Sequence, residues 1–251
     1  MISVPEVSRT DWVRAEAFLS CLKRVLMFSG GFGSGKTEVA VNFALKLRRI
    51  GRQVAVADLD IVNPYFRSRL VQTELSKFGI RFLVPSGALA EADLPIIVPE
   101  VKGAIQESQG HVILDMGGDP VGARVMASLA PQVSEDAIDG MFVLNSRRPR
   151  TRELAGTLAM MKEISSACGV KLSSLVVNSH LVEETVPEVV EEGVSLAEQV
   201  AKQTGARVAF VAVARDMLDR VKVKYPVMVL DRMMLKPWEQ SNWLGRFRID
   251  N

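Results

Sequence analysis

The segment from residue 30 to 37 reads Gly-Gly-Phe-Gly-Ser-Gly-Lys-Thr and constrains the fold more than any other part of the chain. Its spacing, G-x-x-x-x-G-K-[ST], is that of a phosphate-binding P-loop. An apolar run at 25–28 precedes it, and apolar residues within 39–47 indicate a helix after it. Backbone N–H groups and the helix dipole at such a turn attract phosphate. The motif therefore predicts a nucleotide site between a strand and a helix.

Each residue type in this loop suits a task at a phosphate group. Glycines let the backbone curl and approach the ligand closely. Lys36 supplies a point charge for the β- and γ-phosphates and is predicted to be catalytic, while the Thr37 hydroxyl suits Mg²⁺. A glycine turn that matches by chance is the alternative, and the strand–helix context disfavours it. The predicted nucleotide-binding residues of this segment are Gly31, Gly33, Ser34, Gly35, Lys36, Thr37 and Glu38.

A second candidate site begins with the aspartate that follows another apolar run, at 112–114. Because Mg²⁺ takes few protein ligands and keeps several waters, a P-loop needs only one further carboxylate nearby. We expect Asp115 to fill this place, so that Thr37 and Asp115 form the metal site. A turn or helix-cap aspartate is the alternative. Gly118 stands where a backbone N–H would sense a γ-phosphate, and we predict it to be a switch residue.

Two further aspartates, Asp58 and Asp60, end the apolar run at 53–57. Ligands bind at the carboxyl ends of strands in doubly wound sheets, so this loop is a candidate switch region. We predict that Asp60 is catalytic and orients the attacking water, with Asp58 beside it in the switch. The alternative is that one or both cap the turn before Pro64. Arg67 is the third switch candidate, and a surface arginine is equally compatible with its position.

An asparagine and a basic cluster lie in the second half of the chain. Asn178 follows the apolar run 175–177, where the base pocket is expected, and its amide matches the hydrogen-bonding edge of adenine. A turn asparagine is the alternative, and Asn145 is a similar, weaker candidate. The basic cluster favours a solvated loop, with contact to phosphate or to an acidic partner as the second interpretation. It consists of Arg147, Arg148, Arg150 and Arg152.

Composition and periodicity bound the fold and the class of protein. Apolar runs of strand length alternate with helical patterns, which predicts an α/β three-layer fold with a mostly parallel sheet and helices on both faces. One domain is expected, because no linker or repeat interrupts the 251 residues. We divide it into a lead-in helix, a nucleotide-binding domain and a tail packed on that domain. Their ranges are 1–23, 24–230 and 231–251.

Charge and cysteine usage exclude several classes. The net charge of +2 gives no clear nucleic-acid signature. No apolar run approaches the roughly 18 residues of a membrane span. Cys21 and Cys168 lie far apart and form no C-x-x-C pair, so the sequence predicts neither zinc nor an iron–sulfur ligand motif. A reduced, cytoplasmic protein is the expectation.

The motifs at 30–37, Asp58-x-Asp60, Asp115-x-x-Gly118 and Asn178 occur in the order found in P-loop ATPases of the ParA/MinD type, within the CobQ/CobB/MinD/ParA group. The resemblance covers residues 24 to 215 and is firmest over the first 120. It implies a sheet of seven or eight strands, binding of ATP and Mg²⁺, and an ATP-linked homodimer. It also implies a slow ATPase that switches a protein partner. No N-K-x-D signature for guanine is present, which favours ATP over GTP.

The sequence departs from this group at one informative position. The family's P-loop carries an additional lysine, and Gly31 stands in its place. In the family that lysine reaches the nucleotide of the partner subunit, so a different trigger for hydrolysis is expected here. Arg67 or an arginine of 147–152 is the candidate replacement for this charge. The alternatives to a switch are a small-molecule kinase or ligase like dethiobiotin synthetase, and a nucleotide-binding module that does not hydrolyse.

Overall fold

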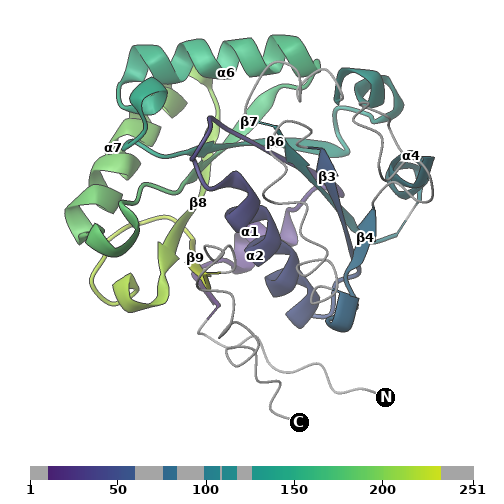
Figure 1. The fold of residues 1–251 in the computed structure, drawn as a ribbon, viewed down its shortest axis with the longest axis horizontal. Coiled ribbons are helices and arrows are strands. Elements are labelled where there is room, and N and C mark those ends of the chain that lie inside the picture. Colours follow the sequence, from purple (N-terminus) through teal and green to yellow (C-terminus); the bar gives the residue numbers. More distant parts are fainter. Residues whose placement is uncertain (1–10, 60–75, 84–98, 108, 118–125, 233–251) are drawn as a thin grey trace, which may run out of the picture.

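A nine-stranded sheet forms the centre of the described part of the protein (Figure 1). The computed structural model describes residues 11–59, 76–83, 99–107, 109–117 and 126–232. The strand order is β1-β9-β8-β7-β6-β2-β5-β3-β4, and every neighbouring pair is parallel except β1 with β9. The strands are β1 (Trp12–Val13), β2 (Val25–Ser29), β3 (Val54–Leu59), β4 (Arg81–Leu83), β5 (His111–Met116), β6 (Ile138–Leu144), β7 (Leu172–Val177), β8 (Arg207–Ala214) and β9 (Val227–Leu230).

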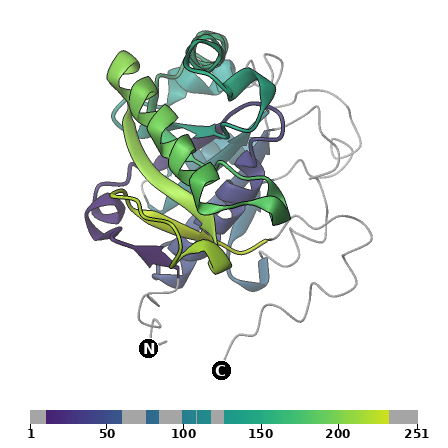
Figure 2. The ribbon, with the colours of Figure 1, turned by 90° about the vertical axis from the view of Figure 1, so that its left-hand side faces the viewer.

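Helices cover both faces of this sheet, which confirms the predicted three-layer α/β P-loop NTPase fold. One face packs α1 (Glu16–Ser20) and α2 (Lys36–Arg49), and the other packs α4 (Pro99–Gln106), α6 (Leu154–Cys168) and α7 (Pro187–Thr204). In the view of Figure 2, α7 lies in front, beside β8. Gly169 and Gly205 end α6 and α7 in the left-handed conformation, where glycine meets no steric penalty.

Alternation along β2 explains why two separate cores form. Val25 and Met27 point into the core under α4, α6 and α7, while Leu26 and Phe28 point into the core under α2. All four side chains are fully buried. A strand covered on both faces reads as a continuous apolar run, because neither face meets water. This is why polar and apolar residues do not alternate in the run before the P-loop.

The N-terminal prediction was partly wrong. A lead-in helix was expected within residues 1–23, but Trp12–Val13 is the strand β1, which pairs antiparallel with β9, and the helix begins only at Glu16. The indole of Trp12 packs edge-on against Phe43 of α2 and Phe210 of β8, with ring centroids 5.4 and 5.5 Å apart. This aromatic packing, formed between distant parts of the chain, favours the strand. It also raises the strand number from the predicted seven or eight to nine in the described residues.

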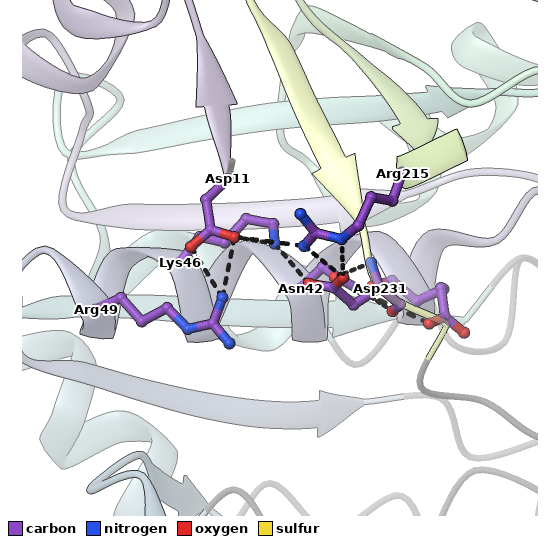
Figure 3. Close-up of polar contacts among 7 residues, drawn as sticks. Asp11, Asn42, Lys46, Arg49, Arg215 and Asp231 are labelled. Atoms are coloured by element: carbon purple, nitrogen blue, oxygen red, sulfur yellow. Dashed lines mark hydrogen bonds and ion pairs between the residues drawn. The ribbon is translucent and has the colours of Figure 1, made fainter. Parts of the chain in front are cut away.

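A polar network around the buried Lys46, the Lys46 network, connects α2 to Asp11, which precedes β1, and to Asp231, which follows β9 (Figure 3). Lys46 Nζ lies 3.2 Å from Asp11 Oδ1 and 3.1 Å from Asp231 Oδ2, and the lysine side chain is 1% exposed. Arg49 donates to both oxygens of Asp11, and Arg215 donates to Asp231. Its members are Asp11, Asn42, Lys46, Arg49, Arg215 and Asp231.

Asn42 completes this network with a backbone-like pairing. Its amide donates to Asp231 O at 2.9 Å, and its Oδ1 accepts from Asp231 N at 2.9 Å. Burial raises the pKa of the Asp231 carboxyl, but the charges of Lys46 and Arg215 outweigh this effect and hold the pKa below its usual value. The helix that begins in the P-loop is therefore anchored to the residue that follows β9.

Candidate functional site

The P-loop connects the end of β2 to the first turn of α2. Gly33 and Gly35 have φ values of 72° and 81°, in the left-handed region that favours glycine. Ser34, Lys36 and Thr37 are only 1%, 7% and 9% exposed, although their side chains are polar. A cluster of buried polar groups at a helix N-terminus is an arrangement that suits an anion.

Thr37 and Asp115 meet beside this loop. Thr37 Oγ1 donates a 2.6 Å hydrogen bond to Asp115 Oδ2, and Asp115 is 3% exposed. The contact follows from the sheet, because β2 and β5 are neighbours and pair Phe28 with Asp115 in register. The two residues that the sequence predicts as metal ligands, 78 positions apart, therefore lie side by side.

The residues present fit a bound Mg²⁺–nucleotide. Ser34 Oγ is buried and makes no hydrogen bond to the residues that the structure describes, so it can serve a ligand. No group of three or more His, Cys, Asp or Glu side chains within the described ranges could hold a metal. In a P-loop magnesium site, phosphate and water supply most of the ligands. Thr37 and Asp115 are the protein groups that would hold the ion.

Asn178, which directly follows β7, contacts the P-loop. Its amide donates a 2.8 Å hydrogen bond to Ser34 O, and the side chain is 2% exposed. A Cβ added to Gly35 would lie only 2.4 Å from Asn178 Nδ2, so glycine is required for this close approach. The structure thus gives Asn178 a role in supporting the loop that sequence reasoning missed. Its contact with a base stays a prediction.

The ends of β6 and β7 are joined by a second set of buried polar contacts. The Asn145 carboxamide oxygen accepts from Arg147 N at 2.9 Å, and Ser179 Oγ accepts from both the backbone N and the hydroxyl of Ser146 at 3.0 Å. Gly193 of α7 lies close by, because a Cβ there would be 2.1 Å from Ser179 Oγ. Asn-Ser at 145–146 and again at 178–179, each following an apolar run, was the available sequence signal for this pair.

The structure separates the four arginines of the basic cluster. Arg148 Nε donates a 2.7 Å hydrogen bond to Gly33 O and so contacts the P-loop. Arg147 pairs with Glu192, and Arg150 pairs with Glu163 at 2.6 Å. Arg150 and Arg152 line an open cleft next to Pro149. The sequence favoured a solvated loop, and the structure instead places Arg148 against the P-loop and pairs Arg147 and Arg150 with glutamates.

His180 lies beside the P-loop in a neutral form. Burial and the nearby charge of Arg148 lower its pKa from 6.5 to about 4. Its Nδ1 accepts from Val182 N at 3.3 Å, so the ring proton of the neutral form is on Nε2, next to Gly35. Val182 has a φ of 58°, which is uncommon for a β-branched residue. The sequence motifs gave no signal for this placement of His180.

We predict that His180 makes the protein less stable as the pH falls from 6.5 to about 4. In this window the unfolded chain binds the proton and the folded chain does not, so the free energy of unfolding decreases. The loss from this group reaches about 2–3 kcal/mol at pH 4.5. Urea unfolding at pH 7 and pH 4.5 measures it, and His180→Gln should show a shallower pH dependence. His111, whose pKa is also lowered by burial, accounts for part of the remaining slope. An unchanged slope in His180→Gln would contradict this assignment.

The other predicted site residues are placed as follows. Asp58 is the penultimate residue of β3 and pairs in register with Asp115 on the adjacent strand β5. Gly31 is buried, and an added Cβ would lie 3.0 Å from Met160 Cε. Glu38 stands in the first turn of α2 and its Oε1 accepts from Asn42 Nδ2 at 3.4 Å. Asp60, Arg67 and Gly118 lie outside the described residues.

Comparison with solved structures gives the class of the fold. The cell division protein FtsY from Thermotoga maritima is 19% identical, with a TM-score of 0.52 over 76% of this chain and 62% of that chain. Chloroplast FtsY from Physcomitrella patens is 18% identical, with a TM-score of 0.51 over 76% of this chain and 58% of that chain. The signal recognition particle 54 kDa protein from Aeropyrum pernix K1, solved in complex with GDP, is 20% identical, with a TM-score of 0.50 over 75% of this chain and 41% of that chain.

These likenesses establish a P-loop NTPase fold. They do not extend to the narrower ParA/MinD assignment, which rests on the sequence motifs. This chain spans less than two thirds of the length of each of the three proteins. No protein-family model matches the sequence, and no curated protein matches it. Among the described residues, no helix has both the length and the apolar character needed to cross a membrane.

Proposed function

We propose that this protein binds Mg-ATP in the P-loop, hydrolyses it slowly, and acts as a nucleotide-dependent switch on a protein partner. The observation that carries the proposal is the 2.6 Å contact of Thr37 with Asp115 beside a P-loop whose polar side chains are buried. Thr37 lies in the first turn of α2, which follows β2 and the P-loop, and Asp115 lies in β5, so the two meet because the sheet places β2 against β5. A chance glycine turn gives no reason for a buried aspartate at this position.

The residues of the site divide the work of phosphoryl transfer, which consists mostly of positioning and charge stabilisation. Lys36 and the loop N–H groups hold the β- and γ-phosphates, and Thr37 with Asp115 orients the metal. The Mg²⁺ ion, when bound, neutralises charge on the phosphate oxygens. Asp60 positions the attacking water, while Asp58 and Arg67 form the switch loop together with Gly118. Asn178 holds the loop backbone in place through Ser34 O.

We assign ATP rather than GTP because the chain contains no N-K-x-D signature. The A. pernix protein, which was solved with GDP, makes the choice of base worth testing directly. The partner is a protein, and a second copy bound across the nucleotide is one such partner. We place the protein in the cytoplasm, where two unpaired cysteines are expected.

Phosphate release from ATP and from GTP tests this proposal. We expect turnover with ATP and Mg²⁺ that rises when the protein partner is added, and no turnover by Lys36→Ala, because the β/γ-phosphates lose their cation. Turnover that rises only with a small metabolite would instead indicate a kinase or ligase. Tight ATP binding without any phosphate release, with partners present, would show a module that does not hydrolyse. Preferential turnover of GTP would overturn the assignment of the base.

A further inference from the structure

Arg148 contacts the P-loop from the turn that follows the neighbouring strand β6. Its Nε donates to Gly33 O at 2.7 Å, and a Cβ added to Gly33 would lie 3.2 Å from Nε and 3.4 Å from Cζ. Gly33 is exposed, and the guanidinium lies against it. The loop position next to Ser34 is thus in direct contact with a cation that comes from a residue 115 positions away.

The backbone around Arg148 is fixed by its own hydrogen bonds. Arg148 N donates to Asn145 O at 3.1 Å, and Arg148 O accepts from Thr151 N at 3.0 Å. The Thr151 hydroxyl adds a 2.7 Å bond to the same Asn145 O. Pro149 follows and restricts Arg148 to an extended conformation, which it adopts with φ −103° and ψ 141°. The arginine is therefore presented to the loop by a turn of defined geometry.

Two other arginines of the basic cluster form ion pairs with glutamates. Arg147 pairs with Glu192 and Arg150 with Glu163. Within the described ranges, no carboxylate pairs with Arg148, whose one hydrogen-bond acceptor there for the side chain is Gly33 O. The guanidinium carries five N–H donors in a planar fork, and Nε uses one. The two terminal nitrogens are left for a ligand.

The chemistry of this group points to phosphate. Guanidinium forks bind phosphate oxygens through two parallel hydrogen bonds, and they remain charged at any physiological pH. Burial lowers the pKa of His180, whose Nε2 lies 3.5 Å from the position of a Cβ added to Gly35, and the charge of Arg148 lowers it further. On the other side of the loop Lys36 supplies one cation, while Gly31 supplies none.

We infer that Arg148 contacts the terminal phosphate of a nucleoside triphosphate held in the P-loop, and that it supplies from the same chain the second positive charge that Gly31 lacks. This inference rests on the proposed nucleotide binding. It selects one of the arginines that the sequence left as candidates. It also predicts that the protein distinguishes a triphosphate from a diphosphate without a lysine from another subunit.

Arg148→Gln tests the inference, with Arg150→Gln as the matched control. Glutamine keeps an N–H donor at the position of Nε, so the anchor to Gly33 O can persist while the charged fork is removed. The probes are the diphosphate and the non-hydrolysable triphosphate of the base that the wild-type protein prefers. We expect Arg148→Gln to bind the triphosphate about tenfold more weakly than wild type, with the affinity for the diphosphate unchanged. Arg150→Gln should match wild type for both nucleotides.

Three results would contradict this picture in distinguishable ways. Equal weakening of diphosphate and triphosphate binding in Arg148→Gln would show that Arg148 only supports the loop. Unchanged triphosphate binding in Arg148→Gln, with wild-type protein that binds nucleotide, would overturn the role of Arg148 alone. Failure of the wild-type protein to bind either nucleotide would overturn the proposed function itself.

Discussion

Asp115→Asn is expected to make nucleotide binding nearly insensitive to Mg²⁺. The wild-type carboxylate lies beside the Thr37 hydroxyl, at 2.6 Å, and is 3% exposed, so the amide would keep the packing but lose the charge that orients the metal. Loss of a group that orients a metal ligand lowers metal affinity or activity by about 10- to 100-fold. Titration of a fluorescent nucleotide in Mg²⁺ and in EDTA measures the difference.

A second buried aspartate provides the control for this variant. Asp139 of β6 is 1% exposed and is bound by Ser173, Ser174 and Arg207, away from the P-loop. Asp139→Asn should lower stability and leave the Mg²⁺ dependence of nucleotide binding intact. Equal loss of the Mg²⁺ effect in both variants would refute the assignment of Asp115 as the metal-orienting residue.

Lys46→Met is expected to lower the free energy of unfolding by about 3–5 kcal/mol. The lysine side chain is 1% exposed and lies between the carboxylates of Asp11 and Asp231, which are 8% and 27% exposed, so removing its charge leaves these two anions without the buried cation between them. Arg49 keeps its hydrogen bonds to Asp11, and Arg215 keeps its hydrogen bonds to Asp231, which limits the loss. Denaturant unfolding at pH 7 measures the change.

An exposed lysine gives the matched comparison. Lys224 is 73% exposed and pairs with Glu198 at 2.9 Å, so Lys224→Met should change the stability far less than Lys46→Met, because surface pairs are solvated and screened. The Asp231 carboxyl, whose pKa is lowered, contributes stability that is present above its unfolded pKa and lost as the pH falls through the folded value. A loss of stability that is no greater in Lys46→Met than in Lys224→Met would contradict the energetic role of the Lys46 network.

Local patterns in the sequence predict the sheet and the P-loop well. Apolar runs buried on both faces mark the central strands, and the glycine-rich motif marks the turn after β2. The mostly parallel sheet with helices on both faces is confirmed. Asp115 lies beside Thr37 because β5 is next to β2 in the sheet. The P-loop motif predicts this strand order only if the protein has a P-loop NTPase fold.

Such local patterns do not predict contacts between side chains that are far apart in the sequence. Lys46 pairs with Asp231 across 185 positions, and Arg148 contacts Gly33 across 115. Lysines in the last turns of a helix usually face the solvent and interact with the helix dipole. Lys46 is instead 1% exposed, because it lies between Asp11, which precedes β1, and Asp231, which follows β9. The strand Trp12–Val13 was missed for the same reason, since its partner β9 lies more than two hundred residues away. Tertiary packing decided each of these cases.

The most direct test of the central claim is calorimetric titration of the full chain with ATP in the presence of Mg²⁺. The account predicts one nucleotide site per chain, with a dissociation constant that rises about 10- to 150-fold in Lys36→Ala, because a charged hydrogen bond to phosphate is lost. Absence of binding by the wild-type protein, or equal binding by wild type and Lys36→Ala, would contradict it.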